Sequence, residues 1–378
     1  MIRIQSKSLR CLSIVAVTVF AEIHAFGETV STAQAQKISQ LKAKAERGFV
    51  RQEIELANAY FVGAGVPRDA AQAAYWYERA AEAGHASAQN EIGYFYEAGI
   101  GVPVDLQRSA HWFQLAAASG SPQGLLNLGV AYLSGRGVPK DEAMCAKLLL
   151  EAFHKGSGFA ASYLGDMYYF GLGEPQDRTI AEHWYEAGFK LHDAMAAYRL
   201  GTLYSVADDH VHDFRKAVEL LRDSSNGGYV LAMHSLGLML VNYPNLAKSE
   251  HEAQPWLEEA ASGGNWRSSV VLGVLARDGK GVPADDKAAY FHFEVGARQG
   301  GAQAQSVVAN DLRIIGRRLG PDVQASVASN ADAWAAQHNL PFLYMDKGGR
   351  SRSPFPPIAI AVAPPGSFVG QLVPLTSH

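Results

Sequence analysis

Small and apolar residues recur along this chain in two alternating helical patterns. In the first, Ala88, Ile92 and Tyr96 lie four residues apart, which places them on one face of a helix. After a break at residues 99–105, a second apolar stripe runs over residues 110–117. This stretch therefore predicts two helices joined by a tight turn.

The turn contains residues that stop one helix and start another. Gly99 and Gly101 give the backbone the freedom to leave the first helix, and Pro103 prevents that helix from continuing. Asp105 is a preferred N-cap residue for the second helix. Gly120 ends the second helix, so the predicted unit is a helix, a turn and a helix.

This unit is repeated with a constant period of 36 residues. The glycine in the middle of the first helix recurs at Gly93, Gly129, Gly165, Gly201, Gly237 and Gly273. The capping aspartate stays in phase, at Asp69, Asp105, Asp141, Asp177, Asp213 and Asp285. Such a long run in phase predicts an all-α fold of the α-solenoid type. A glycine inside a helix costs about 1 kcal/mol relative to alanine, so its recurrence predicts that a neighbouring helix approaches closely there.

The repeated pattern also resembles a known family. Over one period it is AxxxLGxxYxxGxGVxxDxxxAxxWxxxAAxxG, which resembles the Sel1-like repeat, a relative of the tetratricopeptide repeat. The resemblance covers about residues 41–337 and implies a right-handed superhelix of about seven repeats with helical caps. Copies five and six depart from it, because residues 208–212 and 241–249 replace the glycine turns. The family is associated with scaffolding and protein–protein interaction, in bacteria often in the periplasm.

The chain is expected to divide into five segments. These are a secretory signal peptide at 1–35, a capping helix at 36–50, the repeat solenoid at 51–300, capping helices at 301–340 and a proline-rich tail at 341–378. The first segment has a basic start, a short apolar run and small residues before the expected cleavage site. It predicts a secreted protein, in a bacterium a periplasmic one, with no stable membrane span after processing. An uncleaved N-terminal anchor is the alternative.

The proline-rich tail differs in kind from the repeats. It holds seven prolines and shows no helical period, a composition typical of a segment that docks in extended form. A basic stretch at residues 347–352 would tether the apolar residues 353–375 close to the repeats. We therefore consider the chain's own tail as a ligand of the repeats. A tail that makes no contact is the alternative.

Composition narrows the classes of function. The net charge is −4, whereas nucleic-acid-binding proteins typically carry an excess of basic residues. The chain has neither a GxSxG nor an HExxH motif, so we expect no catalytic residues, no cofactor and no enzyme activity. Only Cys145 remains after the signal segment, and its apolar neighbours predict a buried thiol.

One cluster supports a different function. Asp208, His210 and His212 lie together where copy five lost its glycine turn. Carboxylate and imidazole groups bind zinc and other divalent ions, so these residues are weak metal candidates for a metal-dependent hydrolase. The other interpretation is a solvated turn in which Asp213 caps the next helix.

The main candidate site is the inner face of the first helices. In related repeats these helices line a concave groove. The positions three before, one after, four after and five after the central glycine face the solvent there. Here these positions are apolar or aromatic, at Phe61, Tyr94, Leu126, Leu133, Tyr169, Phe170, Tyr198 and Leu238. Exposed apolar patches mark binding surfaces, so we expect a non-catalytic scaffold that binds a protein or extended peptide there. Such a scaffold would suit envelope assembly or signalling control. The alternative is that curvature buries these side chains.

Overall fold

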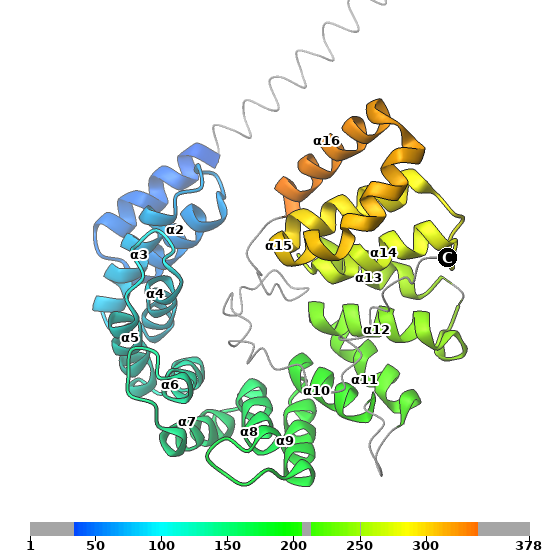
Figure 1. Ribbon diagram of the computed structural model, residues 1–378. Coiled ribbons are helices and arrows are strands. Elements are labelled where there is room, and N and C mark those ends of the chain that lie inside the picture. The colour runs from blue at the N-terminus through cyan, green and yellow to red at the C-terminus, as the bar shows by residue number, and fades with distance from the viewer. Residues whose placement is uncertain (1–33, 206–212, 250, 339–378) are drawn as a thin grey trace, which may run out of the picture. The chain divides into compact units, whose positions relative to one another are not determined.

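The computed structural model describes residues 34–205, 213–249 and 251–338 (Figure 1). The chain separates into two compact units, Met1–Lys140 and Asp141–His378. Every regular element among the described residues is a helix, as the sequence predicts. Residues 1–33 of the predicted signal peptide (1–35) and the whole predicted tail (341–378) lie outside the described residues.

The first unit begins with a helix over residues 34–46. It continues with α2 (Val50–Val62), α3 (Ala70–Glu82), α4 (Ala86–Ala98), α5 (Leu106–Ala118) and α6 (Pro122–Ser134). The first helix packs on the turn that follows α2, since a Cβ on Gly65 would lie 2.7 Å from Nε2 of Gln34 and 3.1 Å from Cγ1 of Ile38. Ala45 is fully buried. This helix therefore covers the open end of the first repeat.

The second unit continues the alternation of helices. Its elements are α7 (Glu142–His154), α8 (Gly158–Phe170), α9 (Arg178–Lys190), α10 (Ala194–Ser205), α11 (Phe214–Asn226), α12 (Val230–Asn242), the 3-10 helix η1 (Pro244–Leu246), α13 (Ala253–Ser262), α14 (Trp266–Asp278), α15 (Asp286–Leu319) and α16 (Pro321–His338). Within each unit, first helices pack on the second helices that follow them, as α2 does on α3, α4 on α5, α8 on α9 and α14 on α15.

Local chemistry sets the ends of the regular helices. Oδ1 of Asp105 accepts a hydrogen bond from the Arg108 N–H at 2.9 Å and so caps α5. The other register aspartates cap α3, α7, α9, α11 and α15 in the same way. At the end of α4, Gly99 adopts a left-handed φ of 70° and its N–H bonds to the Phe95 carbonyl oxygen. The predicted turn chemistry is therefore present.

The central glycines make room for a packed ring or side chain. A Cβ on Gly93 would lie 2.7 Å from Cε1 of Phe113, and a Cβ on Gly273 would lie equally close to the Phe293 ring. Both aromatic rings belong to the second helix of the same repeat. The close approach predicted at this position is confirmed, and the group that fills the space is a side chain of the partner helix.

Successive first helices contact one another directly, as α4 does with α6, α8 with α10, and α12 with α14. Second helices instead meet the next repeat mainly through its first helix, as α5 does with α6. In a curved array the elements on the inner side are closer together than those on the outer side. The first helices therefore line the inner side of each unit.

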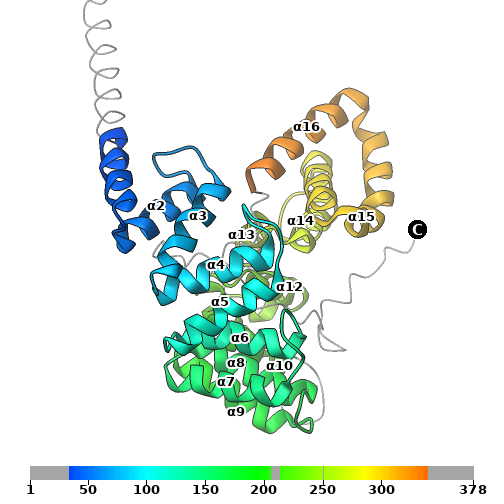
Figure 2. The same cartoon turned by 90° about the vertical axis from the view of Figure 1, so that its left-hand side faces the viewer.

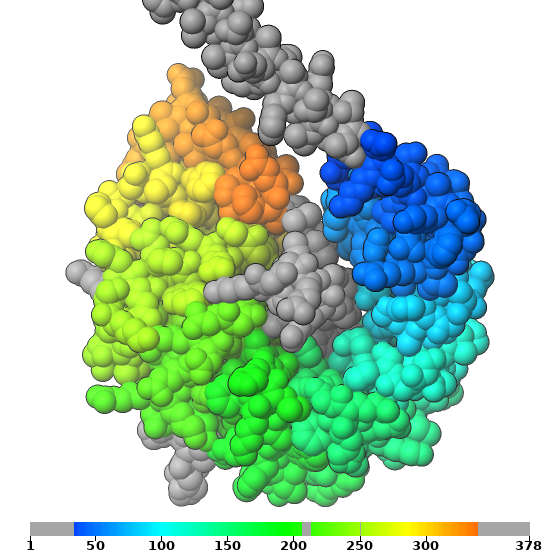
Figure 3. All heavy atoms as spheres, turned by 180° about the vertical axis from the view of Figure 1, so that it is seen from behind, coloured from blue at the N-terminus to red at the C-terminus, as the bar shows by residue number. Residues whose placement is uncertain are grey.

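A further helix pair closes the second unit. The chain turns at Gly301, where φ is 57°, and residues 302–319 then pack beside α16 (Figure 2). Phe293, Val308 and Ile315 are fully buried in the core that joins this pair to α14 and to the first half of α15. Figure 3 shows these helices, coloured yellow to orange, as closely packed side chains.

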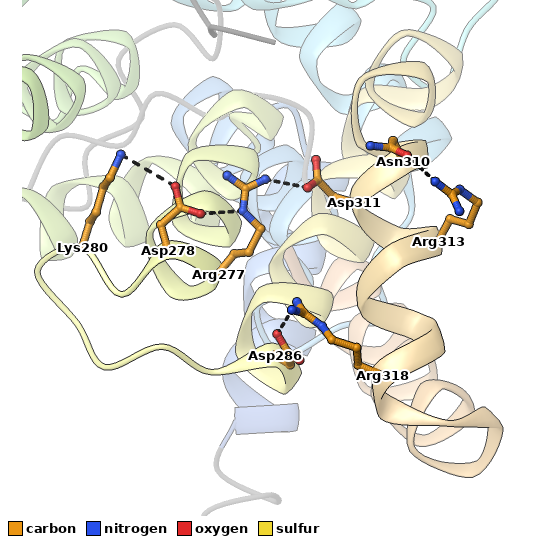
Figure 4. Close-up of polar contacts among 8 residues, drawn as sticks. All are labelled: Arg277, Asp278, Lys280, Asp286, Asn310, Asp311, Arg313 and Arg318. Atoms are coloured by element: carbon orange, nitrogen blue, oxygen red, sulfur yellow. Dashed lines mark hydrogen bonds and ion pairs between the residues drawn. The ribbon is translucent and has the colours of Figure 1, made fainter. Parts of the chain in front are cut away.

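Ion pairs hold the closing pair in place (Figure 4). Nη1 of Arg277 on α14 lies 2.5 Å from Oδ1 of Asp311, and Nη2 of Arg318 lies 2.7 Å from Oδ1 of Asp286. Nε of Arg277 also contacts Oδ1 of Asp278 at 2.6 Å, and this hydrogen bond lowers the pKa of Asp278. The second half of α15 is thereby fixed both to α14 and to its own first turn.

Candidate peptide-binding surface

The inner-face residues fall into two groups. Four of them are at most 9% exposed, namely Tyr94, Leu126, Leu133 and Tyr169. The expectation that these four side chains face the solvent is wrong, because α4, α6 and α8 each pack against a second helix of their own unit and against a neighbouring first helix. The other four keep part of their surface exposed, namely Phe61, Phe170, Tyr198 and Leu238. Partner binding by any of the eight stays a prediction.

In the first unit, the half-exposed residue belongs to an aromatic group. The Phe61 ring lies 5.4 Å from the Phe95 ring, which lies 5.2 Å from Tyr77. The guanidinium of Arg68 lies 5.8 Å from the Phe61 ring. The Tyr77 hydroxyl donates to Oδ1 of Asn58 at 2.7 Å, which ties the two helices of the repeat together. The Phe61 ring thus packs against Phe95 and keeps part of its surface exposed to solvent.

In the second unit, a buried polar cluster joins α8, α9 and α10. Oδ1 of Asp166 accepts a hydrogen bond from the Tyr185 hydroxyl at 2.8 Å, and Oδ2 pairs with Nη2 of Arg199 at 2.8 Å. Asp166 is 1% exposed, whereas the Arg199 side chain keeps 17% of its surface. Burial raises the pKa of Tyr185, so its hydroxyl stays protonated and donates to the carboxylate. The Arg199 guanidinium is therefore held at the edge of the inner face.

Two of the half-exposed rings lie beside this cluster. Phe170 and Arg199 line a small cavity of about 20 Å³, large enough for one water molecule. The Tyr198 ring lies 5.1 Å from the Tyr229 ring and 5.8 Å from the Arg199 guanidinium. The inner face of the second unit thus presents aromatic rings next to a cationic edge, a combination that suits peptide side chains and carbonyl oxygens.

A larger groove lies where copy six lost its glycine turn. Two adjoining cavities of about 350 and 300 Å³ share Gln254, Leu275 and Val282, and we call them together the repeat-six groove. The remaining lining residues are Leu240, Val241, Pro244, Ala247, His251, Ala253, Leu272, Ala276, Lys280, Gly281, Pro283, Ala284, Asp285, Ala288 and His292. The sequence marked this place only as a departure from the pattern.

Two contacts fix the loop that forms the wall of this groove. Arg222 on α11 makes a bidentate pair with Glu252, with Nε to Oε1 at 2.7 Å and Nη2 to Oε2 at 3.0 Å, and Nη2 also donates to the Leu246 carbonyl. Nδ1 of His251 lies 2.9 Å from the Gly281 carbonyl oxygen on the turn after α14. Arg222 lowers the pKa of Glu252, so the pair stays charged. The loop is therefore tied to α11 on one side and to the turn after α14 on the other.

The residues proposed for metal chemistry fall within residues 206–212. Asp208, His210 and His212 lie outside the described residues. Within the described part of the chain, no three His, Cys, Asp or Glu side chains come together in a way that suits a metal ion. Oδ1 of Asp213 accepts hydrogen bonds from the Arg215 and Lys216 N–H groups at 3.0 Å, which is the capping role expected from its register.

Two further features bear on chemistry and location. Cys145 is fully buried, as predicted, and burial raises the pKa of its thiol to about 12. The thiol lies 3.8 Å from Sδ of Met167.

Among the described helices, none combines the length and the apolar character needed to cross a membrane.

The fold defines a class, the α-solenoids built from helix–turn–helix repeats. The family model for the Sel1 repeat matches residues 53–85, 86–121, 122–157, 158–193, 194–229, 230–265 and 270–301. These matches span more than half of the chain, so this protein belongs to the Sel1 repeat family. Sel1 repeats form scaffolds that generally mediate protein interaction.

Two solved structures are similar to this chain. A Sel1 repeat protein from Oxalobacter formigenes is 24% identical, with 66% of this chain and 99% of that chain covered and a TM-score of 0.56. The protective antigen c5321 of uropathogenic Escherichia coli, which displays an SLR fold, is 25% identical, with 81% and 75% covered and a TM-score of 0.42. No curated protein matches the chain.

Proposed function

We propose that this protein is a non-catalytic scaffold that binds a protein or an extended peptide along the inner face of its second unit. One observation carries the proposal. Phe170, Tyr198 and Leu238 lie on three successive inner helices, α8, α10 and α12, and each stays partly exposed. A few buried anchors, aromatic ones above all, carry most of the binding energy of an interface.

Rigidity of the surface supports the same function. The Asp166–Arg199 pair joins α8 to α10, so the rings on these two helices keep a fixed spacing. A surface that is ordered before binding loses less conformational entropy when a ligand docks. A repeat scaffold with preplaced anchors is therefore suited to an extended ligand that touches several repeats at once.

Export is the second part of the proposal. The basic start and apolar run within residues 1–35 support cleavage of a signal peptide and delivery to the bacterial periplasm. A scaffold there would serve envelope assembly or signalling control. Amino-terminal sequencing of the protein isolated from a bacterial periplasm tests this part. A chain that keeps Met1 would contradict it.

Selection from a random peptide library tests the binding surface. The full chain should enrich peptides with apolar anchors, and the triple variant Phe170→Ala, Tyr198→Ala, Leu238→Ala should bind those peptides at least tenfold more weakly. The matched control replaces three exposed apolar residues elsewhere in the same unit, Ile180, Val307 and Ile314, by alanine. Equal binding by the triple variant and the wild type would refute the assignment. Circular dichroism checks that each variant is folded.

A further inference from the structure

The repeat-six groove has the chemistry of a site for an extended apolar chain. Its walls include Leu240, Val241, Pro244 and Val282, and its polar groups are few. Lys280 also lines the groove, and its Nζ lies 3.7 Å from Oδ2 of Asp278 (Figure 4). Concave apolar walls with a few placed polar groups are typical of binding pockets.

The last described helix ends beside this groove. Trp334 on α16 packs on the core cluster that contains Leu272 and Leu275, and these two leucines also line the groove. The His338 ring stacks on the Trp334 ring with 4.0 Å between centroids, and α16 ends at His338. Residues 339–378 therefore leave the described part of the chain close to the groove.

The sequence of that segment matches the groove. Residues 353–365 contain five prolines and the apolar run Ile358–Val362, and they carry no acidic or basic side chain. Prolines restrict the unbound chain to extended conformations, which lowers the entropy lost on docking. We propose that residues 353–365 of the same molecule occupy the repeat-six groove and compete there with other ligands.

The length of the connection permits this contact. Residues 339–352 separate His338 from the proposed ligand, and 14 extended residues span about 45 Å. The whole of α16, with 18 residues, is about 27 Å long. A short flexible tether also gives an effective concentration in the millimolar range, so a weak contact is sufficient for occupancy.

Competition with a labelled peptide tests the proposal on the full chain. The probe is a fluorescein-labelled peptide of residues 353–365, and the tail variant carries Phe355→Asp, Ile358→Asp and Ile360→Asp. The tail variant should bind the probe at least tenfold more tightly than the wild type, because its own segment no longer competes. Equal binding by the two proteins, or no binding by either, would overturn the proposal.

Two changes in the groove identify the site. Added to the tail variant, Val241→Asp places a charge in the groove and Ala247→Trp fills its mouth, and each should abolish probe binding. Only Val241→Asp introduces a charge. If that variant fails to fold, Ala247→Trp still tests the site. Ile314→Asp, on the exposed side of α15, is the control and should leave binding unchanged. Probe binding that survives both groove changes would overturn the assignment.

Sedimentation distinguishes the source of the segment. If residues 353–365 came from a second copy, the wild type would dimerise and the tail variant would be monomeric, and this result would overturn the intramolecular proposal. The test is independent of the surface at Phe170 and Tyr198, since library peptides that depend on those rings should bind the Val241→Asp protein normally. Failure of one proposal therefore leaves the other measurable.

Discussion

Arg199 on α10 forms a buried ion pair with Asp166 on α8, with Nη2 and Oδ2 2.8 Å apart, and so joins the inner helices of two successive repeats. Removal of one partner of a buried pair leaves an uncompensated charge, which typically costs about 3–5 kcal/mol. Arg199→Ala should therefore lower the free energy of unfolding by this order. Urea unfolding followed by tryptophan fluorescence measures it.

The double variant Arg199→Ala, Asp166→Asn is the control for that result. It removes the buried charge together with its partner, and the asparagine still accepts the Tyr185 hydrogen bond. We expect it to be more stable than Arg199→Ala alone. If the two variants unfold at the same urea concentration, the loss comes from packing and not from the charge.

A side chain at position 165 should lower the stability of the protein while Tyr185 is present. A Cβ on Gly165 would collide with the Tyr185 ring, which its hydrogen bond to Asp166 holds in place. Gly165→Ala should therefore destabilise the second unit by about 1–3 kcal/mol through overpacking. In a Tyr185→Ala background the collision is absent, and the same change should be neutral or stabilising by up to about 1 kcal/mol. Equal effects in both backgrounds would contradict this explanation.

His234 should make stability depend on pH. It is 4% exposed on α12, its Nδ1 lies 2.9 Å from Oγ of Ser268, and burial, aided by the charge of Arg267, lowers its pKa from 6.5 to about 4. Between these two pH values the unfolded chain binds a proton that the folded chain does not. The contribution of His234 to the free energy of unfolding therefore falls as pH drops from 6.5 to 4, by about 3 kcal/mol in full.

Urea unfolding at pH 7.5, 5.5 and 4 measures that loss. His234→Gln keeps a hydrogen-bonding group for Ser268 and cannot be protonated, so it should flatten the profile in this window. His111→Gln, at an exposed position, should leave the profile as in the wild type. A profile that His234→Gln does not change would show that another group titrates.

Cys145 should be unreactive in the folded protein. Its side chain is fully buried, so a reagent cannot reach the sulfur. Its thiol pKa is raised to about 12, so at pH 8 the reactive thiolate is almost absent. In a Cys11→Ser background, a thiol-specific disulfide reagent should react only after urea is added. A cysteine introduced at Ile180, which is 39% exposed, should react at once and serves as the control. Rapid labelling of Cys145 in native protein would reveal local opening of α7.

The helices and turns were predictable because their causes lie within one repeat. Asp105 caps a helix that starts at the next residue, and Gly99 ends a helix that lies directly before it. The period then fixes which face of each first helix points inward. It does not fix how closely the next repeat approaches, and for this reason Tyr94 and Tyr169 are buried although their register is that of an inner face.

Contacts between repeats were not predictable from the pattern. Asp166 and Arg199 are 33 residues apart, and Arg222 and Glu252 are 30 apart, so each pair depends on the packing of neighbouring repeats. The repeat-six groove was hidden for a different reason. The loss of a turn motif shows where the regular geometry stops, but it carries no information about the geometry that replaces it.

The repeat-six turn differs from the glycine turns of the other repeats although the period of 36 residues is kept. Gly237 and Gly273 keep the spacing of 36 residues, and α13 has 10 residues where α9 and α11 have 13, so the extra loop residues come from the start of a helix. Point substitutions alone can therefore open a groove in such an array while every later repeat stays in register. In evolutionary terms, each turn is a separate place where a binding site can be gained or lost. For an engineer, residues 171–177 can be transplanted onto 243–249 to restore a closed turn.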